Sequence, residues 1–289
     1  KGEAQGNAVL GFSYLLDSGG DDIYRGGEFS QAAAQFGAAY LIDLEGNDIY
    51  SATRYSQAAA FTAGLAVLDD RKGNDSYIIE KRFLHEPLYN DRYQSLSQGF
   101  SIGDRGKGFA GGIALLSDRE GNDHYSAEVY AQGAGYWFSL GMLWDRAGND
   151  NYTAHIYGQG SGIHLATGIL SDGGGADTYT LLDGVGMGGG HDLAVGILCD
   201  SGDGNDAFQG SGITMGAGHV NGVGIFFNEA GNDSYAGVKK LILGDGSLSR
   251  DTASFGLFID GGGDDTYTDR QAGNEDIWIR GFLGVGIDE

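Results

Sequence analysis

The chain of 289 residues contains 55 glycines, one proline and 41% hydrophobic residues, which argues against both a disordered chain and a proline-rich linker. Its 40 acidic and 17 basic residues give a net charge of −23, which disfavours nucleic acid and anionic membranes as partners, because both need a basic surface. The single cysteine, Cys199, excludes an intramolecular disulfide, and no apolar run is long enough to span a membrane.

A repeat starts near the N-terminus and continues through the chain. We number each copy from the residue that precedes its G-x-D turn, here called position zero. Position zero falls at Asp17, Asp43, Asp70, Asp118, Asp145, Asp172, Asp200, Asn228, Asp260 and Asp288. The spacings are 26, 27, 48, 27, 27, 28, 28, 32 and 28 residues, and a period near 27 indicates stacked repeats. The spacing of 48 is explained by two insertions, around residues 78–97 and 102–108.

The residues before position zero predict the fold. A large apolar residue stands two positions before it and a small residue four positions before it, and this period of two between glycine-rich turns predicts short strands. One copy cannot bury its own apolar face, whereas stacked copies can. The sequence therefore predicts a single domain over residues 1–289, an all-β, right-handed parallel β-helix of about ten coils. Both ends fall within a repeat, so we expect the chain to be part of a longer protein.

Two further features concern packing in this solenoid. A tyrosine follows most turns, and we expect these rings to stack in the core; they are Tyr24, Tyr50, Tyr77, Tyr125, Tyr152, Tyr179, Tyr235 and Tyr267, with Phe208 as the aromatic replacement. The strand before each turn is apolar on both faces. One of these faces should therefore pack against something other than the central core.

The turns carry a family resemblance. Segments such as "GDGNDAF" (202–208) and "GGDDTY" (262–267) resemble the RTX nonapeptide, in which glycines let the backbone curl around Ca²⁺ and an aspartate supplies a ligand. That resemblance implies calcium binding. The whole pattern, D-x-x-G-N-D-x-Y followed by Q-G-x-G, also resembles tandem-repeat bacterial proteins that have no assigned activity.

Electrostatics gives a separate reason to consider a cation. Two aspartates per coil form two lines along one edge, and unit charges about 4.8 Å apart repel by roughly 3 to 4 kcal/mol at an effective dielectric of 20. A file of Ca²⁺ would offset this repulsion, as would another cation. Alternatively, each aspartate caps its turn by accepting backbone N–H groups. The candidate ligands are Asp17, Asp22, Asp43, Asp48, Asp70, Asp75, Asp118, Asp123, Asp145, Asp150, Asp172, Asp177, Asp200, Asp206, Asp233, Asp260 and Asp265.

Two other columns lie between the turns. Glutamines recur seven residues after the tyrosine in the early copies, and we expect a ladder in which each amide bonds the next; they are Gln5, Gln31, Gln57, Gln98, Gln132 and Gln159. An aromatic residue stands two positions earlier, as in Tyr55, Tyr130 and Tyr157. These rings either pack in the core or form an exposed strip on which sugars stack.

Two groups of residues are candidates for catalysis. His191 and His219 are predicted to stack, with His164 close by, and such imidazoles could hold a transition metal or act as acid and base. The same column holds Ala34, Phe61, Phe109, Tyr136 and Ile163, which favours packing instead. The insertions gather basic residues, among them Lys81, Arg92 and Arg105. They resemble the Lys or Arg base of parallel β-helix lyases that act on acidic polysaccharides; alternatively they are simply solvated.

These patterns together favour a non-catalytic, extracellular or surface-exposed β-solenoid that serves as a scaffold, spacer or adhesion module. Calcium would stiffen its acidic edge, and a polysaccharide or neighbouring protein subunits would be its partners. The alternative functions are a lyase-like, polysaccharide-active enzyme with its site at residues 78–107, or a glycan-binding module.

Overall fold

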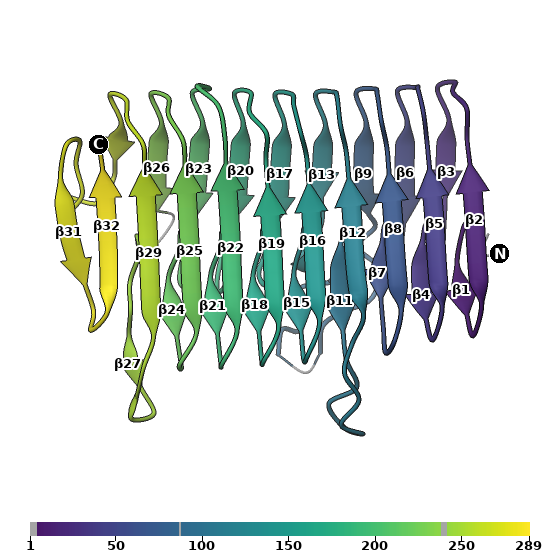
Figure 1. Cartoon of the computed structure of the whole chain (residues 1–289), viewed down its shortest axis with the longest axis horizontal. Helices are drawn as coiled ribbons and strands as arrows, with labels where there is room; N and C mark the ends of the chain where they lie inside the picture. The colour runs from purple at the N-terminus through teal and green to yellow at the C-terminus, as the bar shows by residue number, and fades with distance from the viewer. Residues whose placement is uncertain (1–4, 87, 238–241) are drawn as a thin grey trace.

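The computed structural model describes residues 5–86, 88–237 and 242–289 as a right-handed parallel β-solenoid of about ten coils (Figure 1). Within these residues no helix occurs. Each coil passes through three sheets in turn, here called sheets 1, 2 and 3, and then begins the next coil. The predicted fold is confirmed.

The strands have the following bounds. Sheet 1 contains β2 (Phe12–Leu16), β5 (Ala38–Ile42), β8 (Leu65–Asp69), β12 (Ile113–Ser117), β16 (Leu140–Trp144), β19 (Thr167–Ser171), β22 (Val195–Asp200), β25 (Val223–Asn228), β29 (Phe255–Asp260), β32 (Gly284–Asp288) and β31 (Ile277–Arg280). Sheet 2 contains β3 (Ile23–Arg25), β6 (Ile49–Ala52), β9 (Ser76–Ile79), β13 (His124–Ser126), β17 (Asn151–Ala154), β20 (Thr178–Leu181), β23 (Ala207–Gly210), β26 (Ser234–Gly237) and β30 (Thr266–Tyr267). Sheet 3 contains β1 (Ala8–Val9), β4 (Ala33–Gln35), β7 (Ala59–Ala60), β11 (Phe100–Ile102), β15 (Gly135–Tyr136), β18 (Gly162–Ile163), β21 (Gly190–His191) and β24 (Gly218–His219).

Equivalent residues of successive coils lie directly side by side. Leu41 pairs with Leu68, and Leu68 pairs with Leu116 across the long copy, so the two insertions leave the register of sheet 1 unchanged. The sheets are parallel except at the C-terminal end, where β31 runs antiparallel to β32. Because the register is continuous, the residues at one position of successive repeats form a continuous row along the rod, here called a file.

The core is made of such files. The rings of Tyr50, Tyr77 and Tyr125 are fully buried and stack at 4.8–4.9 Å with interplanar angles of 2°. The stack continues through Phe208 to Tyr267, which confirms the predicted aromatic file. The turn glycines are needed for this close spacing, because a Cβ on Gly73, whose φ is +156°, would lie 1.6 Å from the carbonyl oxygen of Gly46.

Three excursions leave the rod. After β9, the first insertion returns as β10 (Gln94–Ser97), which pairs with β14 (Val129–Ala131). The second insertion follows β11 and is closed by a bridge between Asp104 and Phe109. The third is a hairpin of β27 (Leu248–Ser249) and β28 (Thr252–Ala253), which accounts for the long spacing before Asp260.

Candidate functional site

The turns between sheets 1 and 2 form one continuous edge, here called the aspartate corner, which contains position zero and the second aspartate of every coil. From Asp43 to Asp233, position zero and the second aspartate of each turn are buried rather than solvated; Asp43 and Asp70 are 0% exposed and Asp48 and Asp75 are 1% exposed. Strand β5 ends at Ile42, just before Asp43, and β6 starts at Ile49, just after Asp48, so the backbone holds both side chains toward the interior. Burial of a carboxylate without a partner is costly, so each oxygen must be accounted for.

Position zero is held by two kinds of donor in most coils, although Oδ1 of Asp118 and Oδ2 of Asp200 have no hydrogen-bond partner among the described residues. The tyrosine hydroxyl of the preceding coil donates to its Oδ2, as from Tyr50 to Asp70 at 2.6 Å and from Tyr125 to Asp145 at 2.7 Å. Backbone N–H groups of its own turn donate to its Oδ1, as from Lys72 to Asp70 at 3.3 Å. The predicted turn-capping role is therefore present at this position.

The second aspartate is only half satisfied. Its Oδ1 accepts the backbone N–H of the equivalent aspartate in the preceding coil, as in Asp48 to Asp75 at 2.6 Å and Asp123 to Asp150 at 2.6 Å. Its Oδ2 is buried and has no hydrogen-bond partner among the described residues in six coils, at Asp48, Asp75, Asp123, Asp150, Asp177 and Asp265. Turn capping thus explains one oxygen of this carboxylate and not the other.

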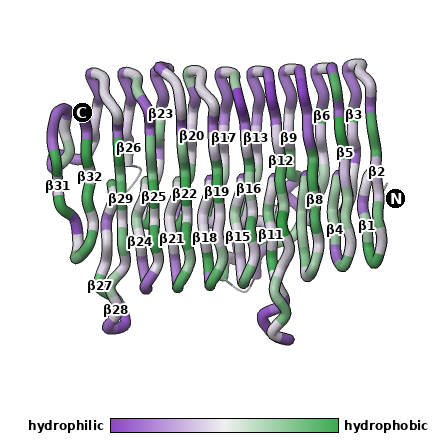
Figure 2. The backbone as a smooth tube through the Cα atoms, in the orientation of Figure 1, coloured by the Kyte–Doolittle hydropathy of each residue, from purple (hydrophilic) through white to green (hydrophobic). Residues whose placement is uncertain are grey.

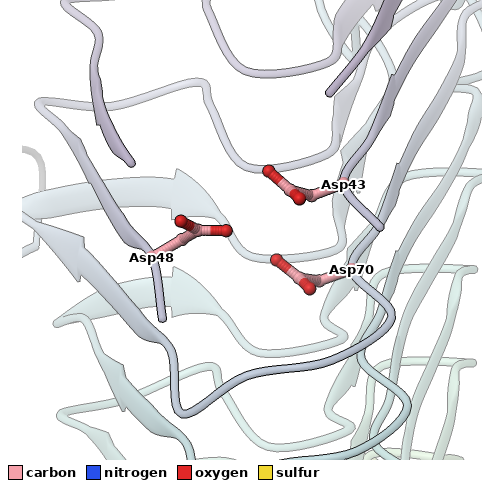
Figure 3. A group of neighbouring side chains, drawn as sticks. All are labelled: Asp43, Asp48 and Asp70. Carbon is pink, nitrogen blue, oxygen red and sulfur yellow. The ribbon is translucent and has the colours of Figure 1, made fainter. Parts of the chain in front are cut away.

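The unpartnered oxygens point toward neighbouring carboxylates. Figure 3 shows the side chains of Asp43, Asp48 and Asp70 converging, with ligand oxygens within 4.8 Å of one another. Equivalent triads follow along the rod: Asp70, Asp75 and Asp118; Asp123, Asp145 and Asp150; Asp150, Asp172 and Asp177; Asp177, Asp200 and Asp206. Oxygens on opposite sides of a Ca²⁺ ion lie roughly 4.6–5.2 Å apart, so the span and the all-oxygen donor set both fit a hard cation.

Crowding of these groups shifts their titration. Burial, and next the charge of Asp70, raises the pKa of Asp75 to about 9. Burial, and next the charge of Asp145, raises the pKa of Asp150 to about 10. The metal-free corner therefore binds protons near neutral pH, because a protonated carboxyl can donate where two carboxylates would repel.

The amide ladder lies at a different column from the predicted one. Gln57, Gln98, Gln132 and Gln159 donate through Nε2 to backbone carbonyls, as from Gln132 to Thr153 at 3.0 Å, and only Gln31 reaches another glutamine. The prediction of a continuous glutamine ladder is wrong. Asparagines of the G-N-D turns form such a ladder instead, since Nδ2 of Asn74 donates to Asn47 and Nδ2 of Asn122 donates to Asn74.

The histidines lie together on the outer side of sheet 3. His191 pairs with His219 in adjacent strands, and their Nδ1 atoms are 3.0 Å apart, so one ring must donate and the other accept. His164 contacts Oδ2 of Asp192 through Nδ1 at 2.5 Å. Burial, with the nearby His219 and His164, lowers the pKa of His191 to about 4. The predicted cluster is thus formed, and its central member, His191, is neutral near pH 7.

The three basic residues that the sequence offers as catalytic candidates lie in two separate places. Lys81 forms an ion pair with Glu128 at 2.7 Å, and Arg92 donates to Nε2 of His155 at 2.7 Å. Arg105 instead lies 5.3 Å from the ring of Trp137. The structure therefore does not bring the three predicted residues to one site.

A groove lies between the two insertions. A cavity of about 370 Å³ is lined by Tyr55, Tyr136, Asp104 and Arg105 among others. A second cavity of about 230 Å³ shares Tyr55 and Tyr136 and is also lined by His85 of the first insertion. The sequence indicated Tyr55 as an aromatic strip residue and Arg105 as an insertion residue, but not that they would share one groove.

The arrangement offers two kinds of chemistry: buried oxygen ligands along the aspartate corner, and an aromatic groove with one cation and one carboxylate at its rim. The described residues include no helix with the length and apolar character needed to cross a membrane. Comparisons with known protein families, with curated proteins and with solved structures found no match for this chain.

Proposed function

We propose that this chain is a non-catalytic, extracellular or cell-surface β-solenoid that acts as a rigid scaffold, spacer or adhesion segment and binds Ca²⁺ along the aspartate corner. The observation that carries this proposal is the repetition of one set of contacts from coil to coil, with aromatic rings stacked from Tyr24 to Tyr267. Such a file gives length and stiffness.

The position of the titratable groups supports a structural role. The aspartates with strongly raised pKa values, such as Asp75 and Asp150, are at most 2% exposed. A perturbed pKa often marks an active site, but a catalytic group must reach its substrate. These carboxyls are enclosed between sheets 1 and 2 and cannot reach a substrate, so their role is structural.

Calcium is supported by charge and by chemistry. Each coil contributes two carboxylates, so one divalent cation per coil would neutralise the file. Ca²⁺ tolerates irregular sets of carboxylate and carbonyl oxygens, and extracellular modules bind it at concentrations of about 10⁻⁴ to 10⁻³ M. The acidic composition of the chain, with its formal net charge of −23, suits such an environment.

The test combines metal analysis with thermal unfolding. We expect the purified protein to carry calcium, and EGTA to lower its melting temperature. Stabilisation of about 2.7 kcal/mol is expected for each site at a calcium concentration one hundred times its Kd. Asp150→Asn should reduce the calcium response, whereas Asp251→Asn, an exposed residue of the β27–β28 hairpin, should leave it unchanged. An EGTA-insensitive melt in calcium-free protein would remove the cation from the proposal.

A second candidate function is glycan binding in the groove between the insertions. It is supported by the aromatic faces of Tyr55 and Tyr136 beside the polar groups of Asp104 and Arg105. Tyr136→Ala should then abolish retention on the recognised polysaccharide, while Tyr14→Ala, an exposed tyrosine of β2, should not. Formation of unsaturated, ultraviolet-absorbing products from an acidic polysaccharide would instead favour the lyase alternative.

A further inference from the structure

The outer face of sheet 1 is mostly apolar along the rod, with polar residues at the outward positions of Asp69, Ser117, Thr167 and Ser171. In each strand the residues five, three and one before position zero point outward, because those two and four before it are buried in the core. The outward residues include Tyr40, Val67, Ile169, Ile197 and Ile225. Among all such outward positions from β2 to β32, only Asp69 is charged, and it pairs with Arg71 and Arg119.

Sheet 2 provides an internal comparison. Its strands belong to the same coils and have the same buried tyrosine file, yet their outward positions are mostly polar, as in Asn151, Thr153 and Thr180. The usual alternation of apolar inside and polar outside therefore holds in sheet 2 and fails in sheet 1. The solenoid itself does not require an apolar outer face.

No described strand packs on this face. Sheet 1 forms the front layer of the molecule in Figure 1, and apolar residues run along its strands in Figure 2. Outward side chains are half-buried by their own neighbours, and those at the ends of the sheet are open, with Phe12 71% and Ile279 80% exposed. The sequence predicts that one face of these strands packs against something other than the central core. The outer face of sheet 1 is that face, and no described strand covers it.

The size of the face matches a stable interface. Ten parallel strands about 4.8 Å apart and five residues of about 3.3 Å each cover roughly 45 by 16 Å, on the order of 700 Å². Two such faces together bury about 1,400 Å², within the range of about 1,200–2,000 Å² for specific protein complexes. An apolar patch larger than a few hundred Å² is uncommon on a monomer and marks an interaction surface.

We propose that the outer face of sheet 1 binds the same face of a second copy of this chain, giving a face-to-face dimer of two solenoids. Side chains on this face form rows with the spacing of the coils, and a second copy has the same spacing, so the rows can interdigitate over the full length. Sheets packed in this way lie about 10 Å apart. Charged groups of this face lie at its edge, where Arg71 and Arg119 pair with Asp69 and Arg146 lies over Trp144. Two copies therefore meet there without the repulsion between acidic surfaces that a net charge of −23 would otherwise cause. This proposal does not depend on calcium.

The first test measures the oligomeric state. Sedimentation of the protein over a range of concentrations should show a dimer. Ile169→Lys and Ile197→Lys place a charge near the middle of the face and should weaken dimerisation roughly a hundredfold or more. Thr180→Lys on sheet 2 is the matched control and should dimerise like the original chain. Melting curves establish that each variant is folded.

The second test uses Cys199, the single cysteine, which points outward on β22 within this face. Its alkylation should be at least about tenfold slower where the dimer forms than in dilute protein, and Ile169→Lys should restore the rate of dilute protein. A monomer at all concentrations up to about 100 μM overturns the proposal. So does a dimer that survives both lysine variants, or one that leaves Cys199 reactive, because its interface then lies elsewhere.

Discussion

The side-chain amide of Asn228 donates a hydrogen bond to Oδ2 of Asp233 at 2.7 Å. That oxygen is the one that has no partner in six other coils, where position zero is an aspartate. Asn228 also donates to the hydroxyl of Tyr235, at 2.9 Å. One coil of this chain therefore shows what the second aspartate requires: a hydrogen-bond donor or a cation next to its Oδ2.

Replacing this amide should make the coil resemble its neighbours. Asn228→Asp removes the donor to Asp233 and adds a buried charge, so we expect the metal-free protein at pH 8 to lose about 1–3 kcal/mol of unfolding free energy. Calcium should recover that loss, because the new carboxylate completes a triad with Asp233 and Asp260. Chemical denaturation with EGTA and with calcium measures both effects. Equal destabilisation in the two conditions would contradict the role of a cation.

The metal-free protein should become less stable as pH rises. Aspartates are protonated only below about pH 4 in the unfolded chain, whereas burial and neighbouring charges raise the folded pKa to about 7 for Asp48, 9 for Asp75 and 10 for Asp150. The folded state thus binds more protons between these values. The protonated aspartates therefore contribute their full stabilisation below pH 4. This contribution is lost as pH rises through the folded pKa values of about 7 to 10.

Melting temperatures in EDTA between pH 5 and pH 9 test this dependence. We expect a decline with rising pH that is smaller in Asp150→Asn, because an amide donates at every pH. Calcium should flatten the same curve, since it replaces the protons. A melting temperature that rises across this interval would contradict the assignment of protons to the corner.

The tyrosine hydroxyls should contribute to stability separately from ring stacking. Tyr125→Phe keeps the ring in the file and removes the donor to Oδ2 of Asp145, which lies 2.7 Å away. Because that carboxylate is fully buried, we expect a loss of about 1–3 kcal/mol in unfolding free energy. Tyr14→Phe is the control, since Tyr14 is 53% exposed and should change little. Equal effects of the two substitutions would argue against the buried bond.

The sequence repeat correctly predicts which residues of successive coils lie side by side, but it does not predict which side chains hydrogen-bond to each other. The period near 27 correctly predicts that Tyr77 lies beside Tyr125 and His191 beside His219, because register is fixed by the stacked strands. Counting back from position zero, however, wrongly placed Phe109 beside Tyr136, where the structure has Ile102, because the second insertion lies between Ile102 and β12.

The hydrogen-bond partners of the glutamines and aspartates differ from the predicted ones for a physical reason. The glutamines have φ angles near +50°, as in Gln132 at +53°, and this left-handed backbone turns the amide toward strand carbonyls rather than the next glutamine. Which donor reaches an aspartate also depends on side-chain contacts within the corner, as where the Asn228 amide reaches Oδ2 of Asp233. Neither property is expressed in the spacing of residues along the chain.

A final prediction concerns two exceptions that occur together. Phe208 is the one turn aromatic without a hydroxyl, and it stands 20 residues before Asn228, the one position zero without a carboxylate. Elsewhere a tyrosine donates to an aspartate at this separation, as from Tyr50 to Asp70. We therefore expect Phe208→Tyr to stabilise the Asn228→Asp protein more than the original chain, by about 1 kcal/mol or more. A double-mutant cycle in EGTA at pH 8 measures this coupling. A coupling of zero would mean that the hydroxyl and the carboxylate do not interact across the coils, and that the two exceptions are unrelated.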